Sequence, residues 1–230
     1  MTATPQGMID GSWYEHQYRT PGSRYRMIYD KPNPQWAVEA NRYAAGLAAA
    51  YIALIPGKSR VLELGSGCGR FLTAWEELGY QITGIEIAQA AIDLGPDRDN
   101  LFQGDAADLS RFADQSFDLV FSAAFLEHVP PETVKQVFSE AARVGVWNAH
   151  FLPLDQGAEA TRDQSHVHMQ DLGTWLEEIR SYLPESYAVA AVPNPPSPNT
   201  PLVVFGMATV TSHVPWPITS AYTAGQLTSS

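Results

Sequence analysis

The sequence predicts a doubly wound α/β fold, in which helices cover both faces of a mostly parallel sheet. Short apolar runs of strand length recur along the middle of the chain, and segments with helical spacing of apolar residues separate them. The first run, residues 61–64, passes directly into three glycines at alternate positions, Gly65, Gly67 and Gly69. Strands that alternate with helices in this way are typical of a parallel sheet with its ligand site at the strand ends.

The pattern assigns each element to a residue range. An alanine-rich helix is expected at about 35–55, between Pro34 and a Pro-Gly turn, and the helix after the glycines runs to about Leu78. Later helices begin at Pro131 and at Asp171, which is suited to cap the helix that follows it. The expected strands are residues 61–64, 81–85, 100–103, 117–121, 144–150, 187–192 and 202–208.

The glycine turn predicts a site for a nucleotide-like cofactor. Glycines let the backbone bend sharply and leave no side chain where a ligand must approach. The spacing Gly-x-Gly-x-Gly differs from the dinucleotide fingerprint, and Arg70-Phe71 stands where a phosphate loop would need Lys-Ser or Lys-Thr. Glu63 places a carboxylate beside the turn, which would repel a pyrophosphate but tolerate a cation.

Acidic residues follow the next two strands. Glu86 ends the second strand, where a carboxylate can accept hydrogen bonds from both hydroxyls of a ribose. Asp105 follows the third strand within Gly104-Asp105-Ala106, where it could accept from an adenine amino group. For either acid alone, a loop residue or a helix cap would be the simpler interpretation.

Taken together, these segments resemble the class I S-adenosylmethionine-dependent methyltransferases. The residues that carry the resemblance are Glu63-Leu-Gly-Ser-Gly-Cys-Gly69, Glu86, Gly104-Asp105-Ala106, Phe117-Asp-Leu-Val120 and Leu126-Glu-His-Val129. The resemblance covers roughly residues 40–210. It implies S-adenosylmethionine as the cofactor and a Rossmann-like, seven-stranded sheet whose last strand is antiparallel.

The resemblance also implies a set of cofactor-binding residues. Gly65 and Gly67 are expected to pass under the methionine part, Glu86 to hold the ribose, and Asp105 and Ala106 to flank the adenine. Ser122 to Ala124 are expected to line the floor of the pocket. The full expected set is Glu63, Gly65, Ser66, Gly67, Cys68, Glu86, Ile87, Gly104, Asp105, Ala106, Ser122 and Ala123.

Candidate bases lie after the fourth and fifth strands, because ligands of open α/β sheets bind outside the carboxyl ends of the strands. His128 is the first candidate, since an imidazole can take a proton near neutral pH; the alternative is a local hydrogen bond or helix cap. His166 is the second candidate base. With His168 it could instead bind substrate or a metal, or belong to a polar surface loop.

The pair Glu127-His128 also resembles the quinone-biosynthesis O-methyltransferases, some of which bind a divalent metal. Their pattern has a further acid three residues before the glutamate. That position is Ala124 in this sequence. We therefore expect no metal.

Composition limits the classes of partner and the cellular setting that we expect for this chain. The 230-residue chain has a formal net charge of −11, which argues against nucleic acid as substrate. No apolar run approaches the ~20 residues that a membrane span requires, and no secretory signal is visible at the N-terminus. The single cysteine, Cys68, favours a cytoplasmic setting.

Three segments are expected: an aromatic-rich N-terminal arm or lid at 1–33, the methyltransferase domain at 34–210 and a C-terminal tail at 211–230. The expected function is methylation of a small-molecule acceptor, with oxygen the favoured acceptor atom. The alternatives are a protein or peptide methyltransferase and a non-catalytic cofactor-binding protein of the same fold. The sequence does not indicate an oligomeric state.

Overall fold

The computed structural model describes residues 9–154, 163–192 and 200–207. Its centre is a seven-stranded sheet in the order β3-β2-β1-β4-β5-β7-β6. The strands are β1 Arg60–Leu64, β2 Gln81–Glu86, β3 Leu101–Gln103, β4 Phe117–Ala123, β5 Gly145–Phe151, β6 Tyr187–Val192 and β7 Leu202–Met207. β7 runs antiparallel to both of its neighbours, and the other pairings are parallel. The predicted topology is thus confirmed.

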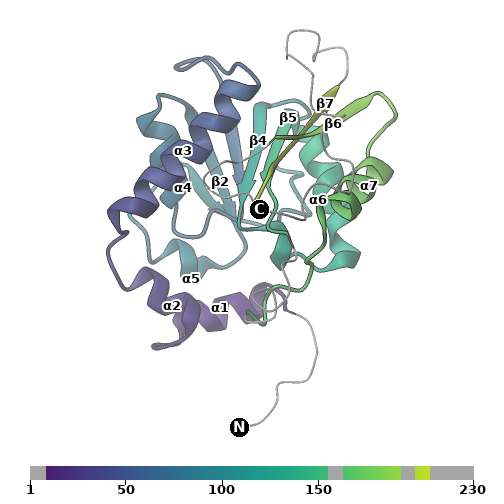
Figure 1. The fold of residues 1–230 in the computed structure, drawn as a ribbon. Coiled ribbons are helices and arrows are strands. Elements are labelled where there is room, and N and C mark those ends of the chain that lie inside the picture. The colour runs from purple at the N-terminus through teal and green to yellow at the C-terminus, as the bar shows by residue number, and fades with distance from the viewer. Residues whose placement is uncertain (1–8, 155–162, 193–199, 208–230) are drawn as a thin grey trace, which may run out of the picture.

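Helices cover both faces of the sheet (Figure 1). The long elements are α3 Gln35–Tyr51 and α4 Arg70–Glu77 on one face, and α6 Pro131–Val144 and α7 Leu172–Tyr182 on the other. Alternate residues of β1 explain this arrangement: Val61 packs with the core under α3 and α4, whereas Leu62 packs with the core under α6 and α7. Asp171 caps α7, as its position in the sequence predicts, by accepting from the Thr174 N–H.

The N-terminal arm contains two helices that its weak periodicity did not predict, α1 Gly11–Arg19 and α2 Arg24–Tyr29. Asp10 and Ser23 cap their first turns through side-chain oxygens. Helix α1 packs against the short helix α5 Gln89–Ile92, and α2 packs against α1, at one end of the sheet (Figure 1). Tertiary contacts hold them there: Tyr18 is buried in a cluster with the alanines of the α5 segment, and the Glu15 carboxylate accepts from the Ala90 N–H at 2.9 Å.

The predicted tail at 211–230 lies outside the described residues. In the described part of the chain, no helix combines the length and apolar character that a membrane crossing requires.

Candidate functional site

The glycine turn lies between β1 and α4 and leads into the helix. Gly65, Gly67 and Gly69 have φ values of +69°, +54° and +82°, which belong to the left-handed region. A Cβ on Gly67 would lie 2.6 Å from the Tyr29 hydroxyl oxygen, and one on Gly65 would lie 2.4 Å from the Phe125 ring. Tyr29 of the arm and Phe125 therefore lie directly over the turn.

Glu86, at the end of β2, is buried and held by the backbone. Its carboxylate accepts from the Gly67 N–H at 2.9 Å and from the Ala88 N–H at 3.0 Å. Burial raises the pKa of the Glu86 carboxyl, and these two hydrogen bonds oppose that rise. A carboxylate can accept about four hydrogen bonds, so Glu86 keeps acceptor capacity for a ligand.

Glu63 lies beneath the turn with only 2% of its surface exposed. Its Oε2 has no hydrogen-bond partner among the described residues. Burial raises the pKa of the Glu63 carboxyl to about 8, and the negative charge of Glu86 adds to that rise. A cationic ligand group next to Glu63 would find an acceptor without a competing partner.

A cavity of about 590 Å³ opens above these residues. Its lining includes most of the expected cofactor set, namely Glu63, Gly65, Ser66, Gly67, Glu86, Ile87, Gly104, Asp105 and Ala106, together with Ala123. The Asp105 Oδ1 accepts from the Ala107 N–H at 2.8 Å, which fixes the loop after β3. Sequence positions from four different strand ends therefore meet in one cavity.

Two expected residues do not line this cavity. The Ser122 side chain is fully buried and its hydroxyl is hydrogen-bonded to His150 Nδ1 at 2.8 Å, because the two residues are register partners on β4 and β5. Cys68 is buried behind the turn, where its carbonyl oxygen packs against Gly95. We had expected both to face the ligand; Ser122 instead belongs to the core, and Cys68 supports the turn.

The arm closes the cavity with an aromatic cluster. Tyr14, Tyr18, Tyr25 and Tyr29 contribute to the lining, and their rings meet mainly edge to face. The Tyr14 ring centroid lies 6.1 Å from that of His128. These rings give the cavity an aromatic wall, and the faces of aromatic rings attract a cation.

His128 lies in the 3-10 turn Leu126–His128, after β4, and lines the cavity. Its Nδ1 is 3.1 Å from the Ser165 carbonyl oxygen. A carbonyl can only accept, so the proton is on Nδ1 and Nε2 is left as the acceptor nitrogen. Burial lowers the pKa of His128 to about 4, which keeps the ring neutral at physiological pH.

The other candidate histidines differ in their surroundings. His166 does not line the cavity, but its ring centroid is 5.0 Å from that of His128 and its Nε2 is 3.8 Å from Asp163. The His168 Nε2 is occupied by Gln170 at 2.6 Å and Glu178 at 3.1 Å. His168 therefore supports the segment, and His166 stands next to the cavity residue His128.

Glu127, His128 and His166 are the residues that come nearest to a metal site in the described part of the chain, with potential ligand atoms within 4.8 Å of one another. The guanidinium of Arg24, 3.4 Å from Asp163, adds a positive charge nearby. The absence of a metal stays a prediction.

Sequence reasoning did not place Asp163, Ser165 or Tyr25 beside His128, which they surround. The motif Asp163-Gln-Ser165 offers a signal, because an aspartate two residues before a serine favours a turn closed by the carboxylate. No local signal connects Tyr25 to it, since the two segments are far apart in the chain.

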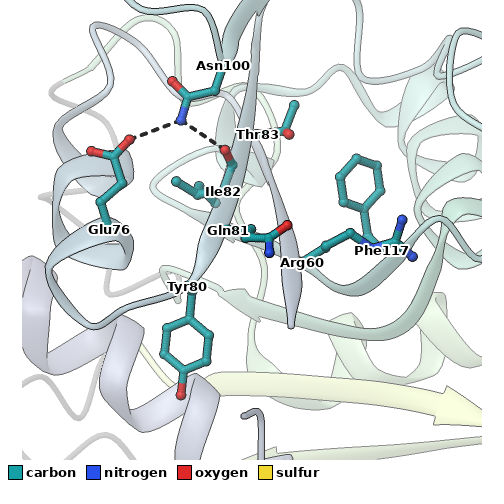
Figure 2. A pocket seen from close by; sticks show the side chains of 8 residues that line it. All are labelled: Arg60, Glu76, Tyr80, Gln81, Ile82, Thr83, Asn100 and Phe117. Carbon is teal, nitrogen blue, oxygen red and sulfur yellow. Dashed lines mark hydrogen bonds between the residues drawn. The ribbon is translucent and has the colours of Figure 1, made fainter. Parts of the chain in front are cut away.

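A second hollow lies at the opposite, amino-terminal ends of the strands (Figure 2). Its polar groups pair with one another: the Asn100 Nδ2 donates to Glu76 at 3.0 Å and to the Ile82 carbonyl at 2.9 Å. Ligands of parallel α/β sheets bind at the other edge. We assign no ligand to this hollow.

Among known protein families, residues 62–151 match a family described as a methyltransferase domain. These residues form a methyltransferase domain. The sheet order, with β7 antiparallel, gives the chain the fold of solved S-adenosylmethionine-dependent methyltransferases.

Solved structures share the fold of this methyltransferase domain at low sequence identity. A methyltransferase from Archaeoglobus fulgidus described as dependent on S-adenosylmethionine is 18% identical, with a TM-score of 0.57; the match covers 73% of this chain and 94% of that one. The putative methyltransferase of Haloferax volcanii in complex with its Trm112 activator is 17% identical, with a TM-score of 0.59, over 80% and 97%. A search of curated proteins found no match.

A third similar structure, the glycopeptide N-methyltransferase MtfA in complex with sinefungin, is 16% identical, with a TM-score of 0.57 over 73% of this chain and 94% of that one. The residues in the cavity of the methyltransferase domain fit S-adenosylmethionine. Glu86 keeps acceptor capacity, and the buried Glu63 Oε2 has no hydrogen-bond partner among the described residues. Tyr29 and Phe125 pack over Gly67 and Gly65 and add aromatic faces beside the turn.

Proposed function

We propose that this chain transfers a methyl group from S-adenosylmethionine to an oxygen atom of a small molecule. The observation that carries the proposal is the orientation of His128, which lines the cavity with Glu86 and Glu63 and donates from Nδ1 to the Ser165 carbonyl. Its Nε2, 3.9 Å from the Glu127 carboxylate, is therefore the nitrogen that can accept a proton. The volume of about 590 Å³ is within the range of small-molecule sites. We also propose a cytoplasmic setting, which the single cysteine supports.

In this proposal the residues of the glycine turn and the strand ends orient the cofactor. Glu86 accepts from the ribose hydroxyls, Asp105 and Ala106 flank the adenine, and Glu63 faces a positive part of the cofactor. The cofactor supplies an electrophilic methyl group for in-line displacement. Holding the acceptor in line with that group can lower the barrier by several kcal/mol.

His128 accepts the proton of the acceptor hydroxyl through Nε2. The low pKa of His128, about 4, keeps the lone pair available but makes the ring a weak base. The fitting acceptors are therefore acidic hydroxyls that still hold their proton at neutral pH, such as phenols, whereas carboxylic acids are already ionised there and need no base. Removal of a positioned base typically costs about 10²- to 10⁴-fold in rate.

The test uses S-adenosylmethionine labelled in the methyl group and a panel of small phenols and carboxylic acids. With a phenol from the panel, His128→Gln should lose about 10²- to 10⁴-fold in turnover and bind the cofactor normally. With a carboxylic acid, which is ionised without the base, the loss should be small. His16→Gln, on helix α1 of the arm, is the matched control and should keep wild-type turnover. Unchanged turnover in His128→Gln would show that His128 is not the base. When the labelled cofactor is incubated with a cell extract, incorporation of label into proteins alone would contradict the small-molecule assignment.

A further inference from the structure

The segment 163–168 lies between the arm and the turn that carries His128. The N–H groups of Val167 and His168 both donate to the Glu127 carbonyl, at 2.9 and 3.1 Å. The Ser165 carbonyl accepts from His128 Nδ1. The segment thus determines both the position of the Glu127-His128 turn and the proton position on the imidazole.

Asp163 holds the Ser165 carbonyl in place. The Asp163 Oδ1 accepts from the Ser165 N–H at 3.0 Å and from the Ser165 hydroxyl at 2.6 Å. The Asp163 carbonyl accepts from the His166 N–H at 3.1 Å. Ser165 is fully buried, so this turn has little freedom to move while Asp163 remains bonded.

The arm binds the same turn from the other side. The Tyr25 hydroxyl is hydrogen-bonded to the Ser165 hydroxyl. Ser165 gives its only hydroxyl proton to the Asp163 carboxylate, so Tyr25 must donate and Ser165 accept. The Arg24 Nε lies 3.4 Å from the other Asp163 oxygen, which adds a charge contact between α2 and the turn.

We infer that Tyr25, Asp163 and Ser165 are positioning residues for His128, and that arm docking and orientation of the base are one coupled event. Ser165 connects the two residues: its hydroxyl accepts from the Tyr25 hydroxyl, and its carbonyl accepts from His128 Nδ1. Because Tyr25 and Tyr29 belong to one helix, the arm that lies over the glycine turn also sets the tautomer of the base. The inference rests on the proposed role of His128 in proton removal.

The chemical consequence is control over when the base can act. With the proton on Nδ1, Nε2 can accept from a bound hydroxyl. Without a fixed Ser165 carbonyl, the proton can move to Nε2, where it would point a hydrogen at the acceptor instead of a lone pair. Withdrawal of the arm would thus leave the domain folded but the base in the wrong tautomer.

The experiment reads the tautomer directly and needs no acceptor. Side-chain ¹⁵N NMR of the full-length protein separates Nδ1–H from Nε2–H histidines, and His128→Gln assigns the signal. Wild-type protein should show His128 as the Nδ1–H form. Loss of a hydrogen bond to Ser165, worth about 0.5–1.5 kcal/mol, should change the tautomer ratio about 2- to 10-fold in Tyr25→Phe and in Asp163→Ala.

Two controls make the outcome decisive. Tyr43→Phe, at a half-exposed tyrosine of α3, should leave the His128 tautomer as in wild type. The buried His150 is hydrogen-bonded to Ser122, so its signal reports whether each variant is folded. If Asp163→Ala does not fold, the test rests on the Tyr25→Phe variant. An unchanged His128 tautomer in folded Tyr25→Phe would overturn the inference.

Titration of the same samples with S-adenosylhomocysteine separates this inference from the proposed function. In wild-type protein we expect binding that shifts the His128 signal, and in Tyr25→Phe a smaller shift. Failure of wild-type protein to bind, with the tautomer result intact, would contradict the proposed function and leave the coupling of arm and imidazole standing.

Discussion

At the scale of single residues, Glu86 is a buried carboxylate that supports the glycine turn and also lines the cavity. Two backbone N–H groups, of Gly67 and Ala88, hold it at the end of β2. Burial of a carboxyl without such donors would be costly. The same bonds that stabilise the turn therefore orient an acceptor toward the cavity.

Glu86→Gln should weaken binding of S-adenosylmethionine about 10- to 100-fold. The amide keeps the size of the side chain but loses charge-assisted hydrogen bonds, which contribute about 1.5–3 kcal/mol. Isothermal titration calorimetry measures the effect, with Glu77→Gln, a surface glutamate paired with Arg42, as the control. Near-normal affinity in Glu86→Gln would contradict the ribose assignment.

The raised pKa of the Glu63 carboxyl predicts that binding of the cofactor releases a proton. Its pKa of about 8 in the cofactor-free protein means that the carboxyl is protonated at pH 6. A cationic cofactor favours the ionised form and therefore lowers that pKa, so binding releases a proton. Between pH 5.5 and 7, affinity should rise by up to about tenfold per pH unit, measured by titration in buffers that differ in ionisation enthalpy.

The same pKa has a consequence for stability. The folded protein retains a proton on Glu63 that the unfolded chain releases above about pH 4.5, so this group's contribution to the free energy of unfolding falls as pH rises from 4.5 toward 8. Glu63→Gln should remove the pH dependence of affinity and reduce that of stability, to which the raised pKa of Glu127, about 8, also contributes. Glu77→Gln should keep both. A pH-independent affinity in wild-type protein would rule out the proton-linked role.

At the scale of elements, the arm helices α1 and α2 depend on the domain beneath them. They are short, and isolated helices of this length are marginal in water. Tyr18 packs on Ala88 and Ala91, and Glu15 bonds to the α5 segment. Contacts of this kind are set by tertiary structure, which explains why the weak periodicity of residues 1–33 did not reveal the helices.

Gly67→Ala should loosen the arm. Besides the strain of an L residue at φ +54°, about 1–2 kcal/mol, the new Cβ would lie 2.6 Å from the Tyr29 hydroxyl and displace that ring. Tryptic cleavage at Arg24 and Arg26 of α2 should become several-fold faster. Gly57→Ala, at φ +74° with open space around it, carries similar strain without the contact and should cleave like wild type; equal protection in both variants would refute the contact.

The strands and their terminal acids could be predicted from the sequence because they depend on local patterns. Apolar runs, glycine spacing and the alternation of elements determined β1 to β5 and placed Glu63, Glu86 and Asp105 at one edge. Ser122 was misplaced, because its face of β4 depends on its partner His150 on β5. Such cross-strand pairs are not visible in one strand's sequence.

At the scale of the whole molecule, the site is built from segments that only the complete fold brings together. The glycine turn, the ends of β2, β3 and β4 and the arm all contribute to one cavity. The Tyr25–Ser165 bond joins residues 140 positions apart. This is why the strand-end residues that line the cavity could be predicted from motifs, while the groups around His128 could not.

The central claim is that this cavity binds S-adenosylmethionine. The most direct measurement is calorimetric titration of the full-length protein with S-adenosylmethionine and S-adenosylhomocysteine, with NAD as the control. We expect micromolar binding of the first two and none of NAD. Failure of both adenosyl ligands to bind, or preferential binding of NAD, would contradict the account.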